Sequence, residues 1–247
     1  MHRFFVEENQ ILDKEIRIKG KDVKHIKDVL RLRLGDSIEL VSQGYLFQVS
    51  IKDISKSQIL TEIINKSLGE NEAKTQIRLY QGLAKGSKME TIFQKGTEIG
   101  IKEFYPIITK RTVVKLGDKK KEANKITRWN TITEEAAKQA KRDQIPRVNE
   151  VQTFNEILDF LKDQDHILVA YEDEDKKSIK QVLNKIQGNE INIIIGPEGG
   201  FDQEEIQRLR DIGAEIVSLG SRILRTETAG LVTASLILYE KDDLGVV

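Results

Sequence analysis

Residues 191–201 read Ile-Asn-Ile-Ile-Ile-Gly-Pro-Glu-Gly-Gly-Phe, and this stretch decides the fold class. Its apolar run, interrupted only by Asn192, is typical of a strand buried on both faces of a parallel sheet. The glycine-rich turn would then lie at the carboxyl end of that strand, where open α/β sheets bind ligands. Glycine lets a ligand approach the backbone closely. The stretch therefore predicts an α/β domain with a ligand site at this turn, unless the glycines serve turn geometry alone.

The glycine turn does not match a phosphate-binding loop. It lacks both Gly-Lys-Ser/Thr and Gly-x-Gly-x-x-Gly. The next helix opens with Asp202 as a good N-cap and Glu205 three residues later, the pattern of a capping box. These carboxylates occupy the positive end of the helix dipole, where an anion would otherwise bind. We expect an uncharged or cationic ligand.

A second stretch, residues 218–229, reads Ser-Leu-Gly-Ser-Arg-Ile-Leu-Arg-Thr-Glu-Thr-Ala. It predicts a strand end, a loop and a helix over Thr226–Glu240 that is apolar nearly all round and therefore buried. Arg222 and Arg225 lie at the start of this helix, where a cation opposes the dipole. Such a cost points to function, although pairing with Glu227 would also explain it.

The chain divides into two parts. Residues 1–70 contain short apolar runs bounded by turns, as in a small β-barrel, with one helix over Lys21–Leu30. Residues 67–76 are polar and are expected to be a linker. From residue 75 to 247 short strands alternate with helices, which favours a parallel sheet covered on both faces. The predicted strands are Ile77–Gln81, Phe104–Ile108, Ile167–Tyr171, Ile191–Ile195 and Ile216–Leu219; the predicted helices are Ser87–Ile99, Lys119–Arg142, Thr153–Lys162, Lys176–Ile186, Asp202–Ile212 and Thr226–Glu240.

The composition excludes several classes of protein. Of 247 residues, 38% are apolar, 32% are charged and none is cysteine. Disulfides and thiolate catalysis are therefore excluded, and the three histidines lack the spacing of metal ligands. No apolar run reaches the roughly 18 residues of a membrane span, and the N-terminus does not resemble a signal peptide. We expect a cytoplasmic protein with no membrane association and no metal.

Positive charge is concentrated in the middle of the chain. Residues 85–147 hold 16 Lys and Arg against 8 Asp and Glu, although the whole chain is neutral. On the helix predicted from Lys119, several polar residues recur at three- and four-residue spacing and share one stripe: Lys121, Lys125, Arg128, Glu135, Gln139 and Arg142. This stripe could face a polyanion or could be a solvated helix surface.

The strings "IIIGPEGGF" and "LGSRILRTETA" resemble the two signature segments of the RsmE family, the uridine N3-methyltransferases of 16S ribosomal RNA in the SPOUT class. The resemblance covers nearly the whole chain, in the segments "HRFFV" (2–6), "HIKDVLRLRLGD" (25–36), "GLAKGSKMETIFQKGTEIGI" (82–101) and "RWNTITEEAAKQAKRDQIPRV" (128–148). The opening segment lacks the proline often found there. Four motifs in the family's order favour membership strongly.

The resemblance implies the architecture and the partners. It implies a PUA-like β-barrel at residues 1–70 that docks RNA, followed at 75–247 by a SPOUT domain whose parallel sheet carries a deep trefoil knot, an exception to the rule that chains are unknotted. It also implies S-adenosylmethionine as cofactor, a homodimer, and 16S ribosomal RNA as substrate, within an assembled small ribosomal subunit.

The resemblance, together with the residues, also assigns sites. Arg222, Arg225 and Glu198 are the expected catalytic residues, with Glu198 or Glu227 as base. The expected cofactor-binding residues come from the loops after three strands: Tyr171, Ile195, Gly196, Pro197, Glu198, Gly199, Gly200, Ser218, Leu219, Gly220, Ile223, Leu224, Arg225, Thr226 and Ala229. The expected RNA-binding residues are Arg3, His25, Arg31, Lys85, Arg128 and Arg142.

Three alternatives stay open on the sequence. The first is a hydrolase or transferase that binds nucleotide phosphates at the glycine turn. The acidic residues at the start of the next helix argue against this alternative. The second is an RNA-binding module without catalysis, which leaves the glycine loops unexplained. The third is a SPOUT methyltransferase that acts on transfer RNA or on a ribose 2'-hydroxyl.

Overall fold

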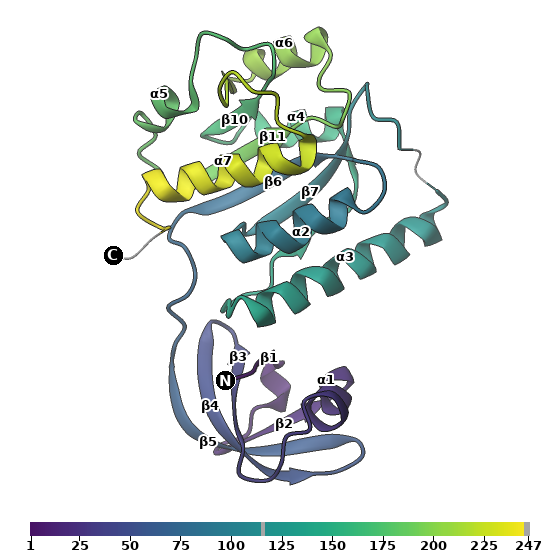
Figure 1. The fold of residues 1–247 in the computed structure, drawn as a ribbon, viewed down its shortest axis with the longest axis vertical. Coiled ribbons are helices and arrows are strands. Elements are labelled where there is room, and N and C mark those ends of the chain that lie inside the picture. The colour runs from purple at the N-terminus through teal and green to yellow at the C-terminus, as the bar shows by residue number, and fades with distance from the viewer. Residues whose placement is uncertain (115–116, 245–247) are drawn as a thin grey trace. The chain divides into compact units, whose positions relative to one another are not determined.

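The structure is a computed structural model that describes residues 1–114 and 117–244. It divides into two compact units, of which unit 1 comprises Met1–Glu72 with Ala137–Ile145, and unit 2 comprises Ala73–Ala136 with Pro146–Val247. Figure 1 shows the elements along the chain. Among the described residues, no helix is both long enough and apolar enough to span a bilayer.

Unit 1 is built on a five-stranded sheet of order β1-β3-β4-β5-β2. Only the β1–β3 pair is parallel. Alternate residues of these strands, such as Ile38, Leu40, Val49 and Ile51, are fully buried and form one apolar core. The elements are β1 (Arg3–Phe5), η1 (Glu8–Gln10), β2 (Glu15–Lys19), α1 (Lys21–Lys24), η2 (His25–Val29), β3 (Ser37–Ser42), β4 (Tyr45–Ile54) and β5 (Gln58–Leu68).

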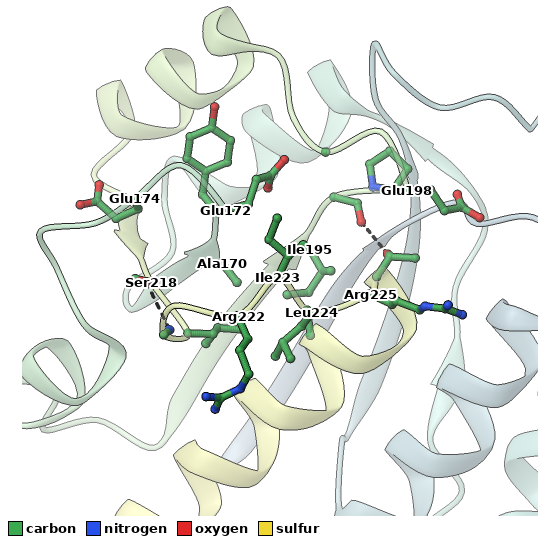
Figure 2. A pocket seen from close by; sticks show the side chains of 18 of the residues that line it. Ala170, Glu172, Glu174, Ile195, Glu198, Ser218, Arg222, Ile223, Leu224 and Arg225 are labelled. Atoms are coloured by element: carbon green, nitrogen blue, oxygen red, sulfur yellow. Dashed lines mark hydrogen bonds between the residues drawn. The ribbon is translucent and has the colours of Figure 1, made fainter.

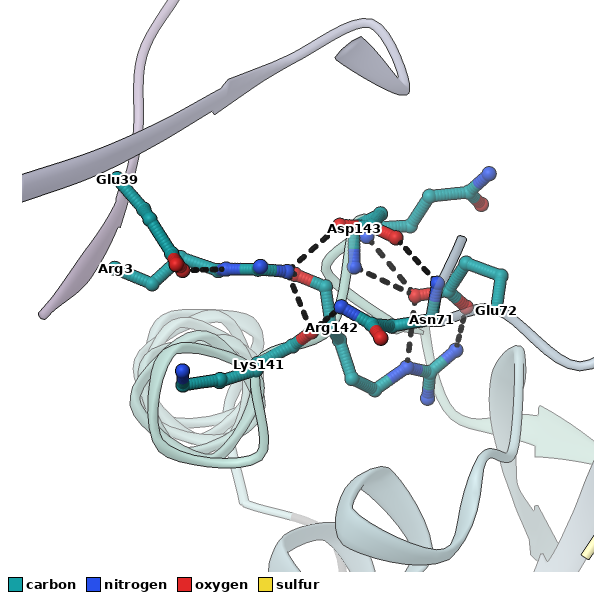
Figure 3. A network of polar contacts seen from close by, with 8 residues as sticks. Arg3, Glu39, Asn71, Glu72, Lys141, Arg142 and Asp143 are labelled. Carbon is teal, nitrogen blue, oxygen red and sulfur yellow. Dashed lines mark hydrogen bonds and ion pairs between the residues drawn. The ribbon is translucent and has the colours of Figure 1, made fainter. Parts of the chain in front are cut away.

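A buried polar network fixes segment 137–145 to the rest of unit 1 (Figure 3). The Arg3 guanidinium lies 2.9 Å from the Glu39 carboxylate and 2.7 Å from that of Asp143. Asp143 also accepts a hydrogen bond from the backbone N–H of Asn71, while Arg142 pairs with Glu72. Because hydrogen bonds accompany these buried ion pairs, the charges are compensated.

This network corrects two predicted RNA contacts. The side chain of Arg3 is 2% exposed and that of Arg142 is 6% exposed. Both guanidinium groups are occupied by carboxylates of unit 1 and are inaccessible to a phosphate. We therefore remove Arg3 and Arg142 from the predicted RNA-binding set.

Unit 2 is built on a seven-stranded, fully parallel sheet of order β12-β10-β11-β6-β7-β8, with β9 paired to β7. Together with the sheet of unit 1, it confirms the predicted α/β class. The strands are β6 (Gln76–Gly82), β7 (Glu103–Ile108), β8 (Arg147–Val148), β9 (Gln152–Thr153), β10 (Ile167–Ala170), β11 (Glu190–Ile195) and β12 (Glu215–Val217). The helices are α2 (Lys88–Ile99), α3 (Lys119–Gln139), α4 (Phe154–Leu161), α5 (Ile179–Leu183), α6 (Gln203–Asp211) and α7 (Thr226–Glu240).

The sheet of unit 2 separates two apolar cores. Ile191, Ile193 and Ile195 of β11 point to one core, which α2 and α7 cover, while Ile194 points to the other, which contains residues of α4 and α6. A strand that is covered on both faces needs apolar residues on both faces, which explains why Asn192 is the one polar residue between Ile191 and Ile195.

The structure departs from the predicted elements in a few places. Helix α3 ends at Gln139, so Arg142 lies beyond it. Helix α7 is not buried all round, since Leu236 is 38% and Tyr239 69% exposed. The predicted domain division at residues 70–75 and the knot stay predictions.

Candidate functional site

The carboxyl ends of three neighbouring parallel strands, β10, β11 and β12, open onto one cavity of about 840 Å3 (Figure 2). This volume lies within the roughly 300–1,000 Å3 of ligand pockets. The loops after these strands and the first turn of α7 supply most of the walls. The cavity thus occupies the edge of the sheet at which the glycine turn predicted a ligand.

The glycine turn is tied to the start of α7. The Thr226 hydroxyl donates a 2.6 Å hydrogen bond to the Gly196 carbonyl and accepts one from the Gln81 side-chain amide at 2.9 Å. All three groups are buried. At Gly82 a Cβ would lie 2.3 Å from the backbone nitrogen of Pro197, so β6 and the turn approach this closely only because residue 82 is glycine. The cavity floor is therefore held by buried hydrogen bonds.

The last glycines of the turn face different neighbours. Gly200 has φ +67°, and a Cβ there would lie 2.1 Å from a carboxylate oxygen of Glu172, which also lines the cavity. Gly199 is absent from the cavity wall; its carbonyl accepts a hydrogen bond from Arg111, and a Cβ there would lie 3.0 Å from that residue. Gly199 itself does not line the cavity, and its predicted contact with the cofactor stays a prediction.

The capping box predicted at α6 is confirmed. The Asp202 carboxylate accepts from the backbone N–H of Glu204, and the Glu205 carboxylate accepts from that of Asp202. The hydrogen bond from Glu204, followed by that from the Lys110 ammonium, lowers the pKa of Asp202. Carboxylates thus occupy the N-terminus of this helix, which leaves no place there for a phosphate.

A lysine of the cavity wall pairs with two carboxylates, of which Glu198 lines the cavity and Glu227 does not. The Lys88 ammonium lies 3.1 Å from Glu198 and 3.5 Å from Glu227. Burial raises the pKa of Glu198, but hydrogen bonds from the backbone amides of Lys85 and Glu198 and from Lys88 outweigh burial, so that this pKa is lowered. The hydrogen bond to Glu198 raises the pKa of Lys88. Both groups are therefore charged at neutral pH.

Lys88 is one of the cavity residues that sequence reasoning missed, as are Glu172, Glu174 and Asp175. Lys88 begins α2, the helix that follows the carboxyl end of β6. A lysine at the start of a helix that follows a strand end, three residues after the predicted RNA contact Lys85, is a pattern that could have identified it from the sequence.

The two predicted catalytic arginines line the cavity but differ in surroundings. Arg222 is exposed on the loop before α7. Arg225 is the N-cap residue of α7; its side chain is 82% exposed and lies 3.9 Å from Glu227. Figure 2 shows the two side chains leaving the loop in different directions. Both guanidinium groups can therefore meet a ligand that arrives from solvent.

The remaining predicted residues separate into two groups. Apart from Gly199, every residue of the expected cofactor set lines the cavity. Of the expected RNA contacts, His25 packs edge-on against Phe4 and Arg31 is exposed with φ 54°, both in unit 1. Lys85 and Arg128 are exposed in unit 2. Within the described ranges, no group of His, Cys, Asp and Glu has an arrangement that could hold a metal ion.

Comparisons with known proteins agree with this architecture. Residues 71–238 match the model of an RNA methyltransferase domain, and residues 18–64 match that of an RNA methyltransferase PUA domain. Ribosomal RNA small subunit methyltransferase E of Bacillus subtilis is 37% identical, over 98% of both chains. The Mesomycoplasma hyopneumoniae protein of that name is 35% identical, over 94% of this chain and 96% of its own.

A solved structure shows the same likeness. The crystal structure of ribosomal RNA small subunit methyltransferase E from Neisseria gonorrhoeae, bound to S-adenosylmethionine, superposes with a TM-score of 0.85 at 29% identity, over 97% of both chains. Along this chain the PUA domain match precedes the methyltransferase domain match. The chain belongs to the RsmE family of ribosomal RNA small subunit methyltransferases.

Proposed function

We propose that this chain transfers a methyl group from S-adenosylmethionine to N3 of a specific uridine in the 16S ribosomal RNA of the small subunit. The observation that carries the proposal is the cavity at the carboxyl ends of β10, β11 and β12, whose walls come mostly from the two signature segments of the family. The relatives' names and the bound cofactor of the Neisseria structure support it.

The residues of the cavity fit this cofactor. Ala170, Ile195, Leu219, Leu224 and Ala229 provide apolar walls for a flat, neutral adenine. The carboxylates of the cavity suit the cationic sulfonium and amino groups and the ribose hydroxyls: Glu172, Glu174, Asp175 and Glu198. We propose the predicted cofactor set, with Glu172 added, as the binding residues. Bound S-adenosylmethionine supplies a methyl group attached to a sulfonium sulfur.

The chain's own residues would prepare the uracil. N3 carries a proton and becomes a good nucleophile when that proton leaves, which spreads negative charge onto the two carbonyl oxygens. The exposed guanidinium of Arg225 or Arg222 would stabilise this charge by preorganised electrostatics. The target base must be unpaired, because N3 lies on its pairing edge.

Two carboxylates are available to take the N3 proton. Glu198 has a lowered pKa and three hydrogen-bond donors, which makes it a weak base. Glu227 has a buried oxygen without a hydrogen bond, 3.5 Å from Lys88. Glu198 lines the cavity, whereas Glu227 does not, so both carboxylates stay candidates for the base.

The wider assembly is part of the proposal. We infer that residues 1–70 dock RNA, through His25 and Arg31, and that residues 75–247 form the catalytic domain, with Lys85 and Arg128 toward the RNA. A homodimer would cover Ile223, Leu236 and Tyr239, which are 87%, 38% and 69% exposed. The expected setting is the cytoplasm, on an assembled small subunit.

The direct test uses the full chain with S-adenosylmethionine and unmodified small ribosomal subunits. The expected result is cofactor binding in calorimetry and one N3-methyluridine per 16S RNA in nuclease digests analysed by mass spectrometry. Methyl transfer to transfer RNA or to a ribose hydroxyl instead would refute the substrate assignment, and absence of cofactor binding would refute the activity.

A further inference from the structure

A second cavity, of about 200 Å3, lies in unit 2 between the start of α2 and the first half of α3. Leu83, Met89 and Trp129 form buried apolar walls, and Val114 and Val151 complete them. The volume is below that of pockets for whole cofactors or drug-sized ligands. An apolar, partly aromatic cavity of this size suits one small flat ring.

The rim of this cavity is charged, unlike its walls. Lys85 and Lys125 are exposed on the rim. The Arg128 guanidinium lies 2.8 Å from the Glu90 carboxylate, and both residues line the cavity. Lys121, one helical turn before Lys125, extends the positive stripe along α3. Cations beside an apolar cavity with an aromatic wall match single-stranded RNA, whose phosphates need positive charge and whose unstacked bases need apolar or aromatic faces.

The two cavities are neighbours. Lys88 lines the cofactor cavity. Lys85, three residues before Lys88, and Met89, directly after it, line the second cavity. The backbone N–H of Lys85 donates a 2.9 Å hydrogen bond to Glu198, which belongs to the first cavity. A strand whose target base enters the first cavity can therefore place an adjacent nucleotide at the second.

We propose that the second cavity holds an unstacked base of the RNA strand beside the methylated nucleotide, with the phosphates of that strand on Lys85 and Lys125. The Glu122 carboxylate on the rim can accept an N–H from the edge of this base. This inference rests on the proposed RNA methyltransferase function and adds a recognition site to it.

Trp129 provides the first test, because it is the one tryptophan among the 247 residues and it lines the cavity. The full chain is titrated with dye-labelled hexauridylate and with an abasic RNA hexamer of equal charge. We expect hexauridylate to bind and to change the emission of Trp129, and the abasic hexamer to leave that emission unaltered. Bound hexauridylate with unchanged emission, or no binding up to millimolar concentration, would overturn the proposal.

Two neighbouring valines provide the second test. Val114 lines the cavity, whereas Val113 is 59% exposed and lies outside the wall. Val114→Phe should fill the cavity and weaken hexauridylate binding by at least about fivefold, the lower end for loss of one stacked base, with unchanged calorimetric affinity for S-adenosylmethionine. Val113→Phe should change neither affinity.

The outcomes separate this inference from the proposed function. If small subunits are methylated normally while both valine variants bind RNA alike, the base site is wrong and the methyltransferase assignment stands. If the wild-type chain binds no S-adenosylmethionine and transfers no methyl group, the proposed function itself fails.

Discussion

The hydroxyl of Thr226 and the carbonyl of Gly196 are joined by a 2.6 Å hydrogen bond that ties the first residue of α7 to the glycine turn after β11. The residues are thirty positions apart in sequence, yet both line the cavity at the carboxyl ends of β10, β11 and β12. Because Gln81 of β6 donates to the same hydroxyl, three elements converge on one buried group. This bridge sets the distance between the two signature segments.

The bridge leads to a prediction for Thr226→Val. Loss of the hydroxyl leaves the Gly196 carbonyl without this donor, and we expect the free energy of unfolding to fall by about 1–3 kcal/mol. The calorimetric affinity for S-adenosylmethionine should fall as well, since the turn loses its anchor. Thr228→Val, on the same helix but outside the bridge, is the control. Equal cofactor affinity in both variants would contradict the role of the bridge.

Two glycines with positive φ allow a matched comparison at the turn. Gly200 (φ +67°) faces Glu172, whereas Gly213 (φ +87°) has no atom within 4 Å of its Cβ position. Alanine at either position should cost about 1–2 kcal/mol of stability for the left-handed backbone. Only Gly200→Ala also displaces Glu172, so it alone should weaken S-adenosylmethionine binding in calorimetry. A similar loss of affinity in Gly213→Ala would show that backbone strain explains the effect.

Arg3 is predicted to stabilise the fold. Arg3→Ala leaves Glu39 and Asp143 buried without their cation, and we expect a loss of about 3–5 kcal/mol in the free energy of unfolding by urea. Arg17→Ala, at an exposed position of β2, should change it by less than about 0.5 kcal/mol. If Arg3→Ala kept its stability and lost only RNA affinity, the original RNA-binding assignment would be restored.

The lowered pKa of Glu198 predicts a dependence of stability on pH. A carboxyl whose pKa is lower in the folded state stabilises that state above its unfolded pKa of about 4.3, and this contribution is lost as pH falls through the folded pKa. Thermal unfolding of wild type and Glu198→Gln, followed from pH 7 downward, should show a smaller loss of stability with acid in the variant. Parallel curves would contradict the ionised, hydrogen-bonded state of Glu198.

Local patterns predicted most of the fold. The run Ile191–Ile195 and the capping box at Asp202 depend on neighbouring residues, and both have the predicted form. The two-residue strands β8 and β9 were not predicted, because such short segments carry no periodicity. The exposure of one face of α7 was not predicted either, because Leu236 and Tyr239 are as apolar as the buried residues around them.

Side-chain roles were harder to predict than elements. The partners of Arg3 lie 36 and 140 positions away, so no local pattern could distinguish a buried ion pair from a phosphate contact. The carboxylates that pair with Lys88 are also distant in sequence, since Glu198 lies in the glycine turn and Glu227 in the first turn of α7. The loop residues that line the cavity at the ends of β10, β11 and β12 were predicted because the family resemblance identified two whole segments.

The central claim, uridine N3 methylation dependent on this cavity, is tested most directly in cells. The 16S ribosomal RNA is mapped by mass spectrometry in cells that lack the protein and in cells complemented with wild type or Arg225→Ala. We predict one N3-methyluridine that is absent without the protein, restored by wild type and largely absent with Arg225→Ala, although that variant folds. An unchanged methylation map in cells without the protein, or full restoration by Arg225→Ala, would contradict the account.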